Sequence, residues 1–152
     1  NAAGAFEEIG FNSQMASAQA ALITAKFRHL EEWIGLRMEI ADQYNRALAD
    51  IDGLDIPEVL PGARHVFHKY VLRAPGRRDA LAQHLKDKGV STMIHYDTPL
   101  HHQPAFQDLV DADLALPAAD HAGDEVISIP IYPELTAEET GHICDSIREF
   151  FS

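Results

Sequence analysis

The sequence predicts an α+β domain, in which a small sheet is covered by helices and a long lead-in helix precedes it. Three observations predict this class: an amphipathic period from Ile23 to Leu48, three short segments of strand character, and a helix-capping motif at residues 136–139. The chain has 152 residues, enough for one domain with its own core. Its 46% apolar and 24% charged residues are typical of a globular protein and exclude a disordered or collagen-like chain.

A long helix over residues 17–50 is the first element expected. Gly53 lies just past the end of the pattern, and Gly35 offers a position for a bend. At 1.5 Å per residue such a helix is about 50 Å long, which exceeds the width of a domain of this size. Its apolar face therefore needs a second body to lie against. The residues of that face follow one another at spacings of three or four: Ile23, Phe27, Leu30, Ile34, Met38, Ala41, Tyr44 and Leu48.

Two strand segments with a helix between them follow a surface loop at residues 54–64. Residues 65–73 alternate and are rich in Val, Phe and Tyr, and residues 90–96 also have strand character. Residues 77–88 place leucines on one side, and Gly89 ends the helix expected there. This order is compatible with a right-handed parallel crossover, although order alone does not establish the pairing.

The last third of the chain begins with irregular structure. Residues 97–125 contain three prolines and predict a loop with two short helical turns, and residues 126–130 predict a third short strand. Thr136 and Glu139 form a capping box that opens a C-terminal helix. Cys144 is the only cysteine, so a disulfide within the chain is impossible. We expect it to be a buried thiol whose pKa is raised by its acidic neighbours.

Acidic residues outnumber basic ones, 24 against 12, which leaves a formal charge of −12. Such a charge repels phosphate backbones and anionic lipid, so we expect neither nucleic acid nor a membrane as a partner. No apolar run approaches the roughly 18 residues that a membrane-spanning helix needs. The first residues also lack the basic and apolar pattern of a signal peptide. These features predict a cytoplasmic protein.

Histidines are frequent, and the densest stretch is HYDTPLHH at residues 95–102. A polar cluster where a strand ends in a proline-containing loop is typical of a ligand-binding site. Two alternatives stay open: surface histidines without a role, and a metal site built on His95, Asp97 and His101. The spacing of those three fits no closed tetrahedral pattern and no HExxH motif is present, so we assign no metal. None of the four lysines has the apolar neighbours that activate a lysine for Schiff-base chemistry.

Four segments together resemble the DegT/DnrJ/StrS-type family. Residues 10–48 resemble its G-[YFL]-N-x-[RQ] segment and the helix after it, and VFHKYVLR resembles its H-x-Y strand. KDKGVSTMIHYDTPLHHQPAF resembles its H-Y-x-x-P-L-H motif, and ADHAGDEVISIPIYPELTAEE resembles its ending. The segments occur in the order of the family and cover the chain from Gly10 to Phe151. Family members are PLP-dependent aminotransferases that act on nucleotide-linked keto-sugars.

The resemblance implies the small C-terminal domain of a fold-type I aminotransferase. Residues 1–16 would then be a remnant of the large PLP-binding domain, residues 17–53 the connecting helix, and residues 54–152 the small α+β domain. The family's Schiff-base lysine, the aspartate that pairs with the pyridine nitrogen and the stacking aromatic all lie upstream of the matched part. The chain begins without Met. We therefore expect part of a longer protein, with no catalytic residue in this chain and no activity of the chain alone.

The resemblance also implies roles for five residues. Asn12 matches the asparagine that reaches the cofactor phosphate across a dimer interface, and Gln14 stands where the family often has an arginine near the same site. A neutral amide does not replace a cation on a phosphate. His95 and Tyr96 match the pair that lines the sugar-nucleotide pocket, and His101 matches the histidine of P-L-H. They stand as candidate substrate-binding residues.

The function predicted is transfer of an amino group, typically from glutamate, to a nucleotide-linked keto-sugar, carried out by a homodimer of the full enzyme with PLP. Two other classes of function are kept. One is a binding or dimerisation module that self-associates through the apolar face of the long helix without catalysis. The other is a metal-dependent hydrolase that binds its metal through His95, Asp97 and His101.

Overall fold

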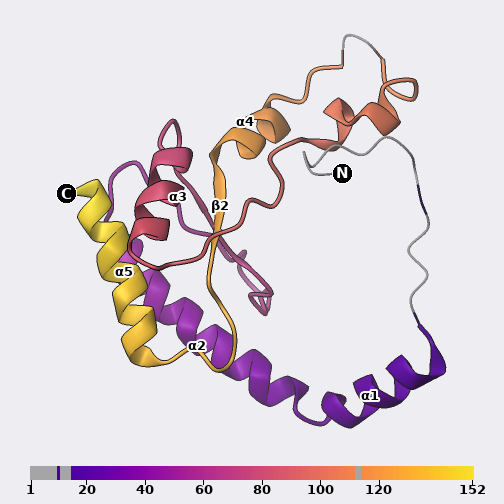
Figure 1. The fold of residues 1–152 in the computed structure, drawn as a ribbon, viewed down its shortest axis with the longest axis vertical. Coiled ribbons are helices and arrows are strands. Elements are labelled where there is room, and N and C mark those ends of the chain that lie inside the picture. Colours follow the sequence, from indigo (N-terminus) through magenta and orange to yellow (C-terminus); the bar gives the residue numbers. More distant parts are fainter. Residues whose placement is uncertain (1–9, 11–14, 112–113) are drawn as a thin grey trace.

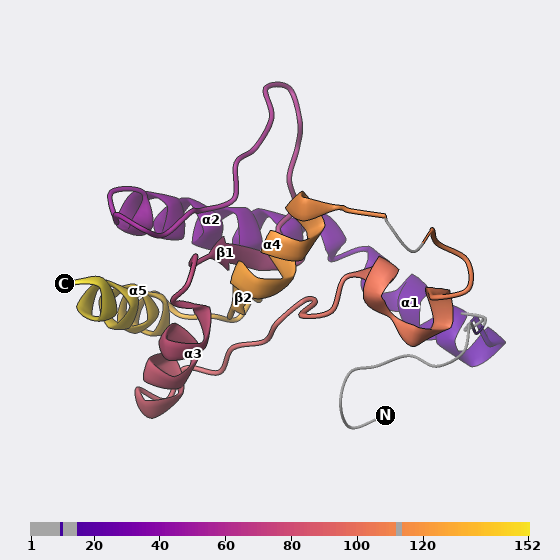
Figure 2. The ribbon, with the colours of Figure 1, turned by 90° about the horizontal axis from the view of Figure 1, so that it is seen from above.

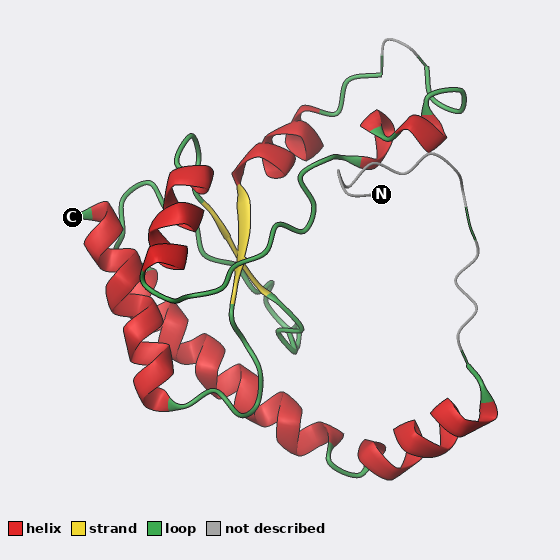
Figure 3. Ribbon diagram, viewed as in Figure 1, coloured by secondary structure: helices red, strands yellow, loops and turns green. Residues whose placement is uncertain are grey.

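The computed structural model describes residue 10, residues 15–111 and residues 114–152 (Figure 1). A small two-stranded sheet lies among helices, with a long loop region on one side and a helical arm on the other (Figure 3). The α+β class is thereby confirmed. The elements in chain order are α1 (Ser17–Phe27), α2 (Leu30–Leu48), β1 (Tyr70–Arg73), α3 (Arg78–Asp87), the 3-10 helices η1 (Leu100–His102) and η2 (Pro104–Phe106), α4 (Pro117–Glu125), β2 (Val126–Ile129) and α5 (Ala137–Phe151).

The long helix expected over residues 17–50 is broken into α1 and α2 at residues 28–29. The bend expected at Gly35 was wrong, because Gly35 lies within the continuous helix α2. No residue of α1 is buried, whereas Ile40, Tyr44 and Leu48 of α2 are. Packing therefore fixes α2 but does not hold α1 in line with it, and α1 extends away from the core (Figure 2).

The sheet consists of β1 and β2, and a single bridge extends it beyond each strand, from Asp55 to Arg73 and from Met93 to Ser128. β1 pairs antiparallel with β2, with Tyr70 opposite Ile129, and Met93 forms an antiparallel bridge with Ser128. β1 and the segment at Met93 both run antiparallel to β2 and therefore run parallel to each other, as the expected crossover requires. They are not paired with each other, because β2 lies between them. The strand expected over residues 90–96 is wrong beyond this single bridge. The first strand begins only at Tyr70.

Two expected helices are confirmed and one is new. α3 ends at Asp87, and Gly89, just past its C-cap, has a φ of 79° that suits glycine. α5 begins at the predicted capping box. There the Thr136 backbone N–H donates to a Glu139 carboxylate oxygen over 2.9 Å, and Glu139 N–H donates to the Thr136 hydroxyl over 3.2 Å. α4 replaces part of the region expected to be irregular. No helix in the described part of the chain is both long and apolar enough to span a membrane.

The core lies between the sheet and the helices α2, α3 and α5. Every residue of β2 is buried, and the phenol of Tyr44 donates a hydrogen bond of 2.7 Å to the carbonyl of Pro130, just after this strand. The buried phenol of Tyr70 donates to the side-chain oxygen of Asn45 over 2.6 Å. Cys144 is buried as expected, and burial together with the neighbouring charge of Asp145 raises the pKa of its thiol to about 11. It is therefore a core residue rather than a nucleophile.

Candidate functional site

A cavity of about 950 Å³ separates the loop after Met93 from α4. Its walls are mostly apolar, with a few histidine, hydroxyl and carboxyl groups among them, which is the usual composition of a small-molecule site. The lining residues are Ile94, His95, Tyr96, Asp97, Thr98, Pro99, Leu100, His101, Gln103, Phe106, Val110, Leu114, Leu116, Ala119, Ala122, Gly123 and Val126. The cavity has the volume for a ligand larger than a single sugar ring.

α4 closely approaches the loop at Gly123. A Cβ added there would lie 2.7 Å from the backbone oxygen of Asp97 and 3.1 Å from Cδ of Pro99. The guanidinium of Arg78 donates to the Gly123 carbonyl over 3.2 Å, which ties this turn of α4 to α3. The missing side chain of Gly123 therefore sets how near α4 and the loop can be, and with that the width of the cavity.

His95 stands between this cavity and a second one of about 460 Å³. Its Nδ1 lies 2.9 Å from the hydroxyl oxygen of Ser128 in β2, a hydrogen bond that fixes the ring. Burial, with smaller effects from the positive charges of Lys69 and His68, lowers the pKa of His95. The imidazole is therefore neutral at pH 7 and can donate or accept a hydrogen bond to a ligand.

Tyr96 is the most accessible of the three predicted substrate-binding residues, with 68% of its surface exposed. Its ring lies edge-on to that of His95, with centroids 5.5 Å apart. The Lys69 ammonium lies 5.6 Å from the centroid of the phenol ring. The aromatic face and the phenolic hydroxyl are thus both available at the mouth of the cavity.

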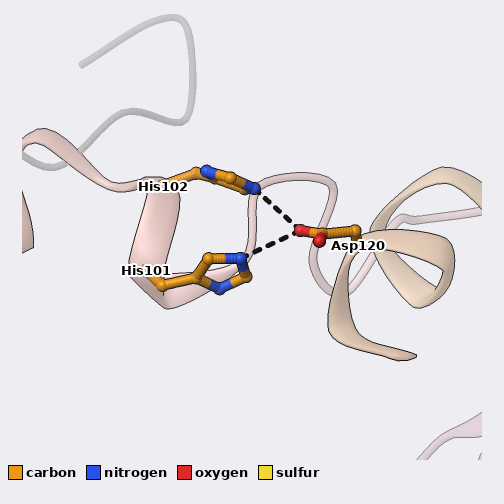
Figure 4. Close-up of side chains that lie close together, drawn as sticks. All are labelled: His101, His102 and Asp120. Carbon is orange, nitrogen blue, oxygen red and sulfur yellow. Dashed lines mark hydrogen bonds and ion pairs between the residues drawn. The ribbon is translucent and has the colours of Figure 1, made fainter. Parts of the chain in front are cut away.

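His101 lies at the opposite end of the same loop and belongs to a cluster of three (Figure 4). Its Nε2 is 2.9 Å from Oδ1 of Asp120, and Nε2 of His102 is 2.7 Å from the same oxygen. Burial opposes ionisation of Asp120, but the hydrogen bond from His102 and the charges of the two imidazoles outweigh it and lower its pKa. The carboxylate on α4 thereby connects α4 to η1.

The structure brings three of the five predicted site residues together, since His95, Tyr96 and His101 line one cavity. Asn12 and Gln14 lie outside the described residues. Among the residues that the structure describes, His101 is grouped with two potential metal ligands, and neither His95 nor Asp97 is one of them. The metal set of the hydrolase alternative is therefore not assembled.

The sequence did not identify Asp120 or His102 as site residues. The one available sign was the similarity of the segment from Ala119 onward to the family's A-E ending, which places an acidic residue at position 120. Nothing in the sequence showed that this residue would meet the histidines some twenty positions earlier. The contact depends on the turn of the chain between η1 and α4.

The lysines of this chain lie outside the large cavity, although Lys69 lines the second one beside His95. The four lysines all lie in the described part of the chain, and none lines the large cavity or is fully buried. Lys88 pairs with Glu149 at 2.6 Å, and the Lys26 ammonium lies 5.9 Å from the centroid of the Trp33 ring. The arrangement around the large cavity can bind and orient a ligand through hydrogen bonds and apolar contact.

Comparison with known proteins gives relatives over most of the chain. A pleiotropic regulatory protein of Geobacillus stearothermophilus is 39% identical and matches 94% of this chain and 39% of its own length. A dTDP-3-amino-3,4,6-trideoxy-alpha-D-glucose transaminase of Streptomyces venezuelae is 33% identical over 95% of this chain and 38% of its own length. The solved structure of S. venezuelae DesV superposes with a TM-score of 0.87 at 33% identity, covering 96% of this chain and 39% of that one.

The chain thus spans about two fifths of the relatives it matches. The model of the DegT/DnrJ/EryC1/StrS aminotransferase family matches residues 2–148, nearly the whole chain. Members of this family depend on PLP. The fold, with its small sheet, lead-in helices and cavity at the H-Y-x-x-P-L-H segment, agrees with these matches, and the chain belongs to the DegT/DnrJ/EryC1/StrS aminotransferase family.

Proposed function

We propose that this chain forms the sugar-nucleotide side of a PLP-dependent aminotransferase that moves an amino group, typically from glutamate, to a nucleotide-linked keto-sugar. The observation that carries the proposal is the cavity of about 950 Å³ which gathers His95, Tyr96 and His101 from one loop. The name of the S. venezuelae relative, a transaminase of a dTDP-linked sugar, supports the substrate class.

In this proposal the residues of the chain bind and orient the substrate. The neutral imidazole of His95, held by Ser128, would hydrogen-bond a hydroxyl or phosphate oxygen. Tyr96 would offer its ring face and hydroxyl at the cavity mouth. PLP, when bound by the full enzyme, supplies the electron sink for amino transfer. Asn12 would contact its phosphate from across the dimer interface, with Gln14 near the same site, and residues 17–53 would connect the two domains.

Replacing His95 with Phe is expected to raise KM for the sugar nucleotide about tenfold, because one buried hydrogen bond is lost and a polar ligand atom is left unpaired. The measurement uses a joined enzyme, in which this chain follows the preceding part of the S. venezuelae transaminase. Without a sugar acceptor, glutamate should still form one 2-oxoglutarate per active site as in the unaltered joined enzyme, because this half-reaction does not involve the sugar nucleotide. His121→Gln is the matched control, because His121 is exposed on α4 and lies outside the cavity lining. Equal KM values for both variants would contradict the role of His95.

A second candidate function, self-association through the lead-in helices, is favoured by one observation. α1 has no buried residue, and Leu22, Ile23 and Phe27 are 68%, 48% and 66% exposed. We propose that these side chains are covered by a second copy of the chain or by the large domain. Sedimentation of the 152-residue chain should show dimers that dissociate when Leu22 and Phe27 are replaced with Ser. A monomer at high concentration would contradict self-association.

A further inference from the structure

We propose that Nε2 of His101, Nε2 of His102 and Oδ1 of Asp120 form a binding site for one divalent cation of the zinc type. Within the described residues these ligand atoms all lie within 4.8 Å of one another (Figure 4). They come from two separate elements, η1 and α4. The inference does not depend on the proposed transferase function.

His101 is the buried member of this cluster, and its contact with Asp120 is not a hydrogen bond. The side chain of His101 is only 6% exposed, and its Nε2 is buried without a hydrogen-bond partner, although Oδ1 of Asp120 lies 2.9 Å away. In the neutral tautomer that carries its proton on Nδ1, a lone pair on this nitrogen faces the carboxylate oxygen directly. A cation between the two atoms satisfies both.

The ligand set fits zinc better than calcium or magnesium, because two of the three atoms are imidazole nitrogens. Three protein ligands and one open position are common for zinc sites that keep a bound water. Zinc–nitrogen distances of about 2.0–2.1 Å place tetrahedral ligands about 3.3 Å apart, so the present contacts of 2.9 and 2.7 Å need to lengthen by about half an ångström. A cavity of about 210 Å³ beside both histidines, lined also by Asp111, leaves space for a water ligand.

Binding of an ion here would have a structural consequence. His101 and Asp120 belong to the two walls of the large cavity, the loop and α4. A cation shared between them would hold these walls at a fixed separation. Since the native chain would bind the ion and the unfolded chain would not hold the three ligands together, the ion should also raise the melting temperature.

The test is titration of the untagged 152-residue chain with zinc chloride by calorimetry, followed by the visible spectrum of the cobalt(II) form. We expect one ion per chain and the absorption of four-coordinate cobalt. His102→Gln and Asp120→Asn should each weaken binding at least about tenfold. His121→Gln should leave the affinity within about twofold, since His121 is an exposed histidine of α4 beside Asp120.

The side chain of His102 is largely exposed, so its replacement leaves the core intact. The zinc affinity of His102→Gln therefore tests the site even if Asp120→Asn unfolds the chain. Circular dichroism of each variant verifies the fold. Absence of saturable zinc binding in the unaltered chain overturns the proposal. The proposal is also overturned if His102→Gln binds zinc as tightly as the unaltered chain, or if His121→Gln weakens zinc binding as much as His102→Gln does.

Discussion

The 152-residue chain alone is expected to transfer no amino group from glutamate to a keto-sugar nucleotide when PLP is supplied. The reason is the position of its lysines: of the four, Lys88 is paired with Glu149, Lys69 lies against the Tyr96 ring, and none lines the cavity. An amine that is paired with a carboxylate or lies outside the cavity is not placed to form a Schiff base with a cofactor bound there. Formation of 2-oxoglutarate measures the reaction, and its level should equal that without protein.

The control for this expectation is the joined enzyme, which should form 2-oxoglutarate under the same conditions. A chain variant with all four lysines replaced by Arg serves as a second control, since it should behave like the unaltered chain. Turnover by the chain alone that disappears in this variant would show that one of its lysines is catalytic, and would contradict the assignment of the chain to substrate binding.

Gly123→Ala is expected to lower the free energy of unfolding by about 1–3 kcal/mol, in the range of other overpacking substitutions. The new methyl group would lie 2.7 Å from a backbone oxygen, which can give way only by a shift of the loop or of α4. The same shift should change the cavity, so we also expect weaker sugar-nucleotide binding in the joined enzyme. Urea unfolding followed by circular dichroism measures the first effect.

Gly141→Ala is the matched control, because Gly141 lies in helix α5 with nothing within 4 Å of the added methyl group. Alanine favours the helix over glycine, so this variant should be more stable by about 0.4–1 kcal/mol. The two substitutions are chemically identical and differ only in the space around them. If Gly123→Ala also stabilised the chain, the close approach of α4 to the loop would be wrong.

The parts of the fold that could be predicted from the sequence are those governed by local rules. The capping box at Thr136, the glycine after α3 and the apolar period of α2 each act within a few residues, and each was correctly placed. The strand that ends at Ile129 was also found, because a short apolar run followed by proline is a local pattern.

The parts that failed depend on distant contacts. Residues 90–96 have strand composition, but only Met93 forms a bridge with β2, and strand composition alone does not determine which residues pair. α4 was missed because its sequence, PAADHAGDE, has a single buried residue, Gly123, and so no apolar stripe. The break at residues 28–29 follows from the lack of packing along α1, which no periodicity reveals.

The candidate site shows the same division. His95, Tyr96 and His101 could be found because they lie in one segment that resembles a family motif. Asp120 joins them only through the fold, since nineteen positions separate it from His101. The role of Gly123, whose missing side chain sets the distance between α4 and the loop, likewise depends on a tertiary contact.

The most direct test of the central claim, that this chain is the sugar-nucleotide side of an aminotransferase, is amino transfer by the joined enzyme. Nitrogen-15 from labelled glutamate would be followed into a panel of dTDP- and UDP-linked keto-sugars by mass spectrometry. We expect labelled amino-sugar nucleotide from at least one member of the panel, and about tenfold less product with His95→Phe at low substrate concentration. A joined enzyme that forms 2-oxoglutarate from glutamate but aminates no sugar nucleotide would contradict it.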